Sequence, residues 1–420
     1  MKPYRVTVGL VVMRALFVLL LVSGYPLLGA ARDVPQDPPV ARAVPAIERE
    51  PLVRQGFDHF YSLEYDRAIR SFEAAARKYP DDPFAVNYLL SAVIFKELYR
   101  IGALDSEMYA NNNFADRPPA KKIDPAVKAR IYELIEQATK LSEARLKVNP
   151  ADIDALYARG ATRSMRSTWM GMGEKSWFAA VRAGVGARRD HEAVLELDPT
   201  YADAKTSVGV HNYIVGSLNW AAKLGASVIG ISGSKEKGLQ YLREAAASGG
   251  LASMDAKIAL ALFLRREEKY KEALDVVRGM TITYPRNFLV ANEYAYLLNA
   301  SGDGPSAVVA FRRVLSNYHA GRYALARPEL AAFGLGEALR GQRRFNEAAQ
   351  AYASVSGFHE AEQELVQRAD LRAGEMYDVL NNREAALRLY RTVIEADQST
   401  SAAKVAKKRL KQPYTENQKE

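Results

Sequence analysis

The sequence predicts an all-α fold, a right-handed superhelical array of helical hairpins with enlarged central repeats. One observation is an alanine followed four positions later by an aromatic residue, at Ala68/Phe72, Ala307/Phe311, Ala348/Tyr352 and Ala386/Tyr390. A second is a small residue twelve positions before each of these alanines and before Ala273, at Gly56, Ala261, Ala295, Gly336 and Gly374. A third is a proline twelve positions after Ala68 and Ala273, at Pro80 and Pro285.

Each part of this pattern has a physical role in a helical hairpin. A small residue on the first helix lets the second helix approach closely, and an aromatic residue four positions after an alanine covers the same face of its helix. Proline cannot continue a helix, so it ends the second one. The pattern resembles the tetratricopeptide repeat (TPR) family. The resemblance covers residues 56–80, 261–285, 295–319, 336–355 and 374–393, although the last three frames lack the closing proline.

The N-terminal residues predict export. Residues 1–14 are basic, 15–22 are apolar, and Gly29 and Ala31 are small, which is the pattern of a secretory signal peptide. We expect a signal peptide over residues 1–31 with cleavage after Ala31, and an uncleaved N-terminal anchor is the alternative. Residues 32–48 contain four prolines and predict a disordered linker. The expected location is the periplasm or the cell envelope.

The spacing of the repeat divides the rest of the chain. Gly160 lies 39 positions before Pro199, whereas Gly56 lies 24 before Pro80. Residues 49–253 therefore predict N-terminal and enlarged central TPR-like repeats. Residues 254–398 predict regular repeats, 399–412 a capping helix and 413–420 a tail.

The apolar tract over residues 212–238 has three interpretations: core packing, a pocket for a small molecule or lipid, or contact with a membrane surface. A membrane span is excluded because Lys223 and Lys235 bound too short an apolar stretch. We expect a first helix over 202–215 in which Gly209 touches its neighbour, and a second helix over 236–247. Between them, a short helix is expected to bury Trp220, Leu224 and Ile229 against neighbouring repeats.

The sequence predicts neither an enzyme nor a cofactor or metal site. There is no cysteine, and the His-Glu pairs at His191 and His359 lack the second histidine of a zinc-protease helix. The net charge of +9 permits an acidic partner or an anionic membrane surface, but we expect no nucleic acid.

Two candidate sites follow. The TPR resemblance implies that first helices line a concave face, and it places there a partner-binding groove of Arg265, Arg266, Asn292, Tyr296, Asn299, Glu337 and Arg340. It places Val53, Phe57, Phe60 and Tyr61 on the same face of the first repeat. All three tryptophans fall between residues 169 and 220, which suggests a ligand pocket of Arg166, Trp169, Trp177, His211, Tyr213 and Trp220.

The predicted function is an exported TPR scaffold that mediates protein–protein interaction. The alternative is a transport-associated component that binds a small molecule or lipid through the central repeats. The tract around residues 209–250 resembles the inclusion-body-clearance TPR family and the periplasmic TPR component of TRAP-type transporters. The second resemblance implies ligand delivery across the envelope, and neither assigns a functional residue here.

Overall fold

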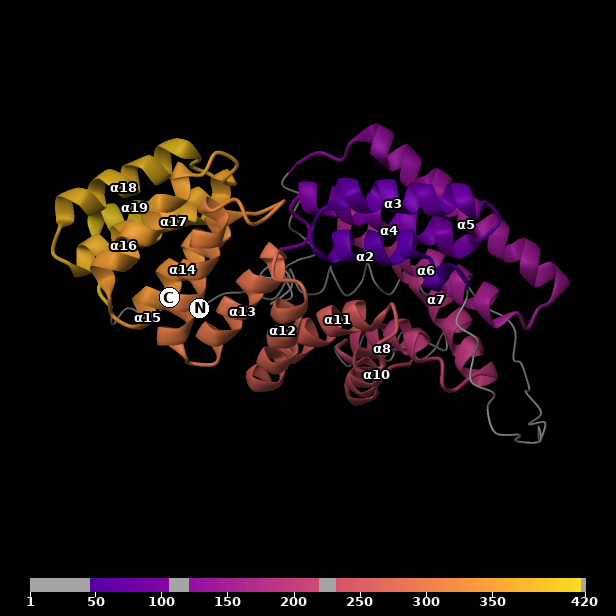
Figure 1. Ribbon diagram of the computed structural model, residues 1–420. Helices are drawn as coiled ribbons and strands as arrows, with labels where there is room; N and C mark the ends of the chain where they lie inside the picture. The colour runs from indigo at the N-terminus through magenta and orange to yellow at the C-terminus, as the bar shows by residue number, and fades with distance from the viewer. Residues whose placement is uncertain (1–45, 106–120, 219–231, 417–420) are drawn as a thin grey trace, which may run out of the picture. The chain divides into compact units, whose positions relative to one another are not determined.

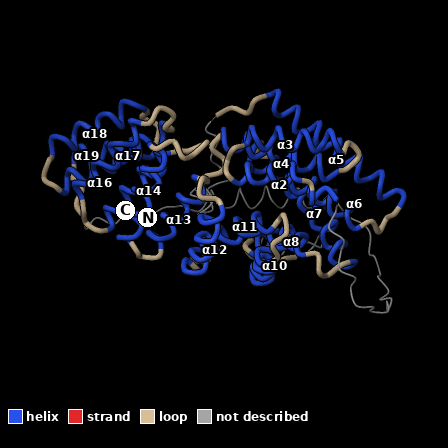
Figure 2. The backbone as a smooth tube through the Cα atoms, viewed as in Figure 1, coloured by secondary structure: helices blue, strands red, loops and turns tan. Residues whose placement is uncertain are grey.

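The computed structural model describes residues 46–105, 121–218 and 232–416, and within these ranges every regular element is a helix (Figures 1 and 2). The chain divides into two units. Of the described residues, unit 1 holds 46–56, 68–104, 121–218 and 232–263, and unit 2 holds 57–67, 105 and 264–416. The predicted signal peptide and the predicted short helix with Trp220, Leu224 and Ile229 lie outside the described residues.

The first helices in chain order are η2 (Ala46–Arg49), α2 (Pro51–Tyr61), α3 (Tyr65–Lys78), α4 (Pro83–Arg100), α5 (Pro125–Val148), α6 (Ile153–Thr168), η5 (Trp169–Gly173), α7 (Trp177–Leu197), α8 (Ala202–Gly216), α10 (Lys235–Ala247) and α11 (Ser253–Arg266). The remaining helices are α12 (Tyr270–Thr283), α13 (Phe288–Ala300), α14 (Gly304–His319), α15 (Pro328–Gly341), α16 (Phe345–Ala353), η6 (Ser354–Gly357), α17 (Gln363–Val379), α18 (Arg383–Ala396) and α19 (Ser401–Lys411). From α4 to α10 in unit 1 and from α12 to α19 in unit 2, described helices that follow one another along the chain pack side by side. None of the described helices combines the length and the apolar character that a membrane crossing requires.

Prolines end the second helices, as the sequence predicts. The helices α3, α5, α7 and α12 each end two residues before a proline, at Pro80, Pro150, Pro199 and Pro285. In three of these turns, the second residue after the proline is an aspartate or asparagine that caps the next helix, at Asp82, Asp152 and Asn287. A short motif therefore both stops one helix and starts the next.

The predicted contact between a small residue and an aromatic ring is present in both units. A Cβ added to Gly56 would lie 2.3 Å from the Phe72 ring, and one added to Gly336 would lie 2.5 Å from the Tyr352 ring. The ring in each pair is fully buried. These glycines are required by close approach of the second helix, and each ring lies 16 positions after its glycine.

The enlarged hairpin of α6 and α7 keeps the same contact with a different ring. His191 is buried against Gly160, whose added Cβ would lie 2.6 Å from His191 Cε1. His191 lies 31 positions after Gly160, so the extra residues fall between the two contact partners. They lengthen both helices: α6 continues past Gly160 into the π-helical turn η5, and α7 begins at Trp177. His191 of the His191-Glu192 pair is therefore a packing residue of the hairpin.

Helices α8 and α10 approach through glycines on both sides. A Cβ added to Gly209 would lie 3.0 Å from the Gly238 carbonyl oxygen, and one added to Gly238 would lie 2.6 Å from the Tyr213 backbone nitrogen. The predicted contact of Gly209 with a neighbouring helix is confirmed. The helices at α8 and α10 start and end within one residue of the predicted ranges.

Substitution Gly336→Ala is expected to destabilise unit 2 by about 1–3 kcal/mol, because the Tyr352 ring is buried and cannot move aside. Gly341→Ala in the same helix is the matched control, since nothing lies within 4 Å of its added Cβ. Helix propensity alone should leave that variant neutral or more stable by up to ~1 kcal/mol. Urea unfolding followed by circular dichroism measures both, and equal midpoints for the two variants would contradict the packing account.

Candidate binding surfaces

The predicted partner-binding residues lie on successive first helices of unit 2. Arg265, at the end of α11, donates from Nη1 to Glu293 Oε2 of α13 at 2.9 Å. Its guanidinium also lies 5.7 Å from the centre of the Tyr296 ring. Tyr296 in turn donates its hydroxyl to the Leu330 carbonyl at 3.0 Å. Arg265 is thus held in place by an acid and by a ring from the next first helix.

Glu337 organises the same face further along the unit. Arg340 Nη2 lies 3.0 Å from Glu337 Oε2, and the buried Tyr352 hydroxyl donates to Glu337 Oε1 at 2.6 Å. Burial and the Glu337 carboxylate raise the pKa of Tyr352, so its hydroxyl keeps the proton that it donates. The core contact at Gly336 therefore also fixes the position of a surface carboxylate.

The charges continue in alternation across α15, α17 and α19. Arg372 Nε lies 3.8 Å from Glu337 Oε1, and its Nη1 lies 2.9 Å from Glu375 Oε2. Arg409 Nε lies 3.1 Å from Glu375 Oε1. We name these four residues, Glu337, Arg372, Glu375 and Arg409, the charged row. Because it contains both signs, this face does not present the unopposed arginines that an acidic peptide alone would select.

The other predicted groove residues differ in access. Arg266 and Asn299 are half-buried, whereas Asn292 is buried and its Oδ1 has no hydrogen-bond partner among the residues that the structure describes. In the N-terminal frame, the expectation of a surface role is wrong for three residues. Val53, Phe60 and Tyr61 are buried in the core, because α2 is packed on its apolar side.

The six residues of the predicted ligand pocket do not line one cavity. Trp169 and Tyr213 are fully buried core residues: Trp169 packs on Gly173, and Tyr213 stacks on Phe263 with ring centres 3.8 Å apart. Trp177 is half-buried against Gly171. His211 faces Arg188, and Trp220 lies outside the described residues.

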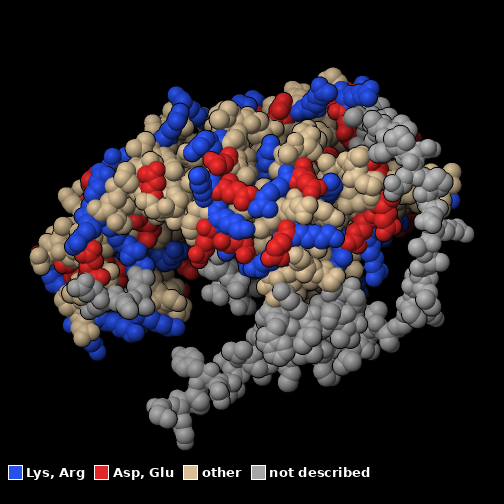
Figure 3. Space-filling view, turned by 90° about the horizontal axis from the view of Figure 1, so that it is seen from below, with Lys and Arg blue, Asp and Glu red and all other residues tan. Residues whose placement is uncertain are grey.

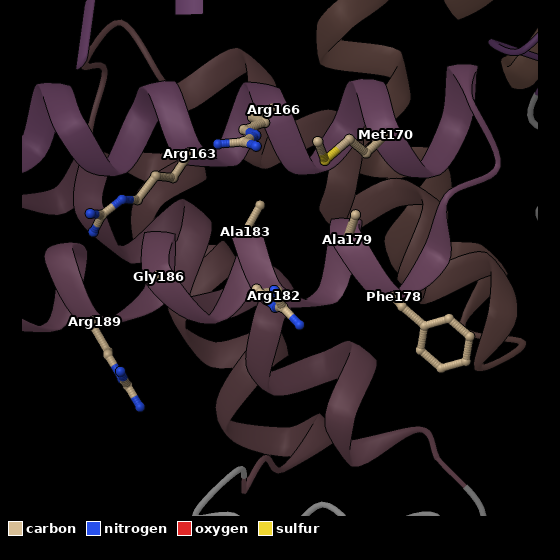
Figure 4. A pocket seen from close by; sticks show the side chains of 9 residues that line it. All are labelled: Arg163, Arg166, Met170, Phe178, Ala179, Arg182, Ala183, Gly186 and Arg189. Carbon is tan, nitrogen blue, oxygen red and sulfur yellow. The ribbon is translucent and has the colours of Figure 1, made fainter. Parts of the chain in front are cut away.

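A cavity of about 620 Å³ lies instead between α6 and α7 (Figure 4). Of the five predicted residues that the structure describes, only Arg166 lines it. The lining is made by Arg163, Arg166 and Met170 of the α6 side and by Phe178, Ala179, Arg182, Ala183, Gly186 and Arg189 of α7. In Figure 4, Ala179 and Ala183 point toward α6, so small side chains leave the space that the longer ones surround.

The cavity has an excess of positive charge. Buried Asp190 accepts from Arg159 Nη2 at 2.7 Å and from Arg163 Nη1 at 2.6 Å. Arg166, Arg182 and Arg189 are exposed and have no acid as an ion-pair partner within the described part of the chain. No lining residue is acidic. By contrast, Lys, Arg, Asp and Glu are interspersed over the face of the molecule seen in Figure 3.

Sequence reasoning missed the α7 side of this cavity. Phe178, Arg182, Gly186 and Arg189 recur at helical spacing and therefore share one face of a helix. The predicted pocket instead included Trp169 and Tyr213, because large aromatic side chains are common in ligand sites. Both rings are buried in the core by tertiary packing, and this could not be predicted from the residue type alone.

The fold defines the class of protein: the described part of the chain is an α-solenoid of the TPR type.

No protein-family model and no curated protein sequence matches the chain. Among solved structures, PilF of Pseudomonas aeruginosa is similar at 15% identity over 60% of this chain and 99% of its own, with a TM-score of 0.38. A TPR protein from Parabacteroides merdae is similar at 14% identity over 77% and 98%, with a TM-score of 0.32. A human IFIT1 dimer with m7Gppp-AAAA is similar at 13% identity over 88% and 86%, with a TM-score of 0.42.

His211 is expected to stay neutral well below its ordinary pKa. Its Nε2 lies 3.1 Å from Arg188 Nη1, and since arginine can only donate, this nitrogen must be the unprotonated acceptor. Burial first, and then the charge of Arg188, lower the pKa of His211 from 6.5 to about 4.

As the pH falls, His211 is therefore protonated near pH 6.5 in the unfolded chain but only near pH 4 in the folded chain. The free energy of unfolding should fall between those pH values, by about 1–2 kcal/mol after allowance for partial exposure. The variant His211→Gln should lose this part of the pH dependence. NMR titration of the His211 ring measures the pKa directly, and a midpoint near 6.5 would contradict the assignment.

Proposed function

We propose that this protein is an exported TPR scaffold that binds a protein partner in the periplasm or at the cell envelope. The observation that supports the proposal most is the regular presentation of polar and charged side chains from successive first helices of unit 2. In α-solenoids, such side chains form an extended binding surface. We propose no catalytic role and no cofactor for it, and no nucleic acid as partner.

The charged row favours a partner of mixed charge. Glu337 and the buried Glu375 each pair with two arginines, and Glu337, Arg340, Arg372 and Arg409 are partly exposed, so an incoming acidic group can bind one arginine while the other stays paired. An extended peptide that carries both acidic and basic side chains would meet complementary charge at Glu337, Arg372 and Arg409, the partly exposed members of the row. The half-buried Asn299 and Arg266 supply further hydrogen-bond donors near one end.

Partner binding is expected to depend on the groove arginines. The mature chain, residues 32–420, is immobilised and exposed to an envelope extract, and the captured proteins are identified after chemical cross-linking. The variant with Arg265, Arg266 and Arg340 changed to alanine should lose the captured partner.

The matched control changes three exposed arginines on second helices, Arg313, Arg388 and Arg391, to alanine, and it should retain the partner. Equal capture by both variants, with thermal melts that show both to be folded, would remove the groove from the proposal.

Export is expected to follow from residues 1–31. Expression of the full chain should give a mature product whose N-terminal sequence begins at Arg32, in the periplasmic or membrane fraction. An intact N-terminus in the membrane fraction would support the uncleaved anchor instead. An intact N-terminus in the cytosolic fraction would contradict export.

A second candidate function is the binding of a small molecule or lipid in the central repeats, with peripheral membrane contact as one form of it. The cavity between α6 and α7 favours it, because about 620 Å³ is within the size range of small-molecule sites. This candidate concerns unit 1 and is compatible with partner binding on unit 2.

A further inference from the structure

The extra residues of the central hairpin build the cavity. Every residue that lines it falls between Gly160 and His191, the two partners of the repeat contact. A regular hairpin with 16 positions between the small residue and the ring, such as the one from Gly336 to Tyr352, has no segment equivalent to this extension. The contact itself is unchanged, so the added helical turns are not needed to hold the hairpin together. Instead, these added turns enclose the cavity between α6 and α7.

The lining has a polar and an apolar part. Arg166 and Arg182 come from opposite helices, and Arg189 lies two turns further along α7 (Figure 4). Met170 and Phe178 are the large apolar residues of the lining, and both are close to the turn η5 along the chain, Met170 within it and Phe178 at the start of α7 (Figure 4). Phe178 is 59% exposed, whereas Met170, in η5, is buried. Within the described residues, an exposed ring beside these arginines leaves both hydrophobic area and positive charge without a counterpart.

The other charges around the cavity support an anion rather than a neutral molecule. Asp190 is buried and forms ion pairs with Arg159 and with the lining residue Arg163. It therefore offers little to Arg166, Arg182 or Arg189. Guanidinium groups bind phosphate and carboxylate oxygens in paired, charge-assisted hydrogen bonds.

We propose that the cavity between α6 and α7 binds an amphipathic anion. Its phosphate or carboxylate group is bound by Arg166 and Arg182, and its apolar part covers Met170 and Phe178. This inference rests on the second candidate function, ligand binding in the central repeats, and names the chemical class of the ligand. A free amphiphile and the headgroup of a lipid share this chemistry.

The test is calorimetric titration of the mature chain at low ionic strength with n-octyl phosphate below its micelle concentration. Inorganic phosphate, the neutral n-octyl glucoside and the cationic octyltrimethylammonium are the comparison probes. Octyl phosphate is expected to bind at least tenfold more tightly than any of the three, because only it has both parts of the ligand. Binding should weaken with added salt.

Two variants assign the two parts of the site. Changing both Arg166 and Arg182 to alanine should weaken octyl phosphate binding at least tenfold, and both side chains are exposed, so the fold should persist. Phe178→Ala should weaken octyl phosphate about fivefold and leave inorganic phosphate unchanged. The control variant changes Arg70 and Arg77, exposed arginines of α3, to alanine and should bind like the unmodified chain.

The outcomes separate the possible failures. If octyl glucoside binds as tightly as octyl phosphate, and only Phe178→Ala weakens it, ligand binding stands and the anion class is overturned. If no probe binds, both this inference and the second candidate function are overturned, while the scaffold proposal is unaffected.

Vesicles distinguish the source of the anion. Phosphatidylglycerol and phosphatidylcholine vesicles are sedimented with each protein. Retention on phosphatidylglycerol that requires Arg166 and Arg182, together with octyl phosphate binding, indicates a lipid headgroup as the source. Octyl phosphate binding without retention indicates a free amphiphile. If the protein sediments with phosphatidylglycerol vesicles but does not bind octyl phosphate, the proposed site is overturned, and the vesicles are bound by general electrostatic attraction to the protein surface.

Discussion

The close contact between a small residue on one helix and a ring on the next is the constraint on which the rest of this structure depends. At Gly56, Gly336 and Gly374 the nearest ring atom lies 2.3–2.7 Å from where a Cβ would be, so the two helices approach as far as backbone atoms allow. The constraint also extends to the surface. Tyr352 and Tyr390 donate their hydroxyls to Glu337 and Asp378, at 2.6 and 2.8 Å. Core packing therefore fixes the position of a partly exposed acid, Glu337, and of a buried one, Asp378.

The central hairpin shows what this constraint leaves free. His191 occupies the place of the ring against Gly160, and the additional residues extend α6 and α7 beyond the contact. An insertion at this point alters neither partner of the contact. It can therefore acquire its own composition, which here is small residues between arginines, with tryptophans at the tip. One hairpin can therefore contain both the packing contact of the repeat and the cavity for which ligand binding is proposed.

Much of the fold follows from the sequence because its signals are local and periodic. The helix ends before Pro80 and Pro285 and the contact at Gly209 were predictable from spacing alone. The surfaces were less so, because an ion pair such as Arg372 with Glu337 joins side chains from different helices, and its formation depends on side-chain conformation. The predicted ligand set grouped Trp169 with Arg166 by nearness in sequence, whereas one is buried in the core and the other lines a cavity. The face of Arg182 and Arg189 could have been found by helical spacing.

The most direct test of this account is the NMR chemical shift of glycine Hα protons in selectively labelled protein. A proton held over the face of an aromatic ring is shifted upfield by the ring current. Gly56, Gly160, Gly336 and Gly374 are expected to show such shifts, and Gly279 and Gly341, with nothing within 4 Å of an added Cβ, serve as references. An upfield shift at Gly160 would place the enlarged hairpin in the same frame as the regular ones. A Gly160 shift equal to the references, with the other three displaced, would contradict the claim that the central hairpin is an extended copy of the regular repeat.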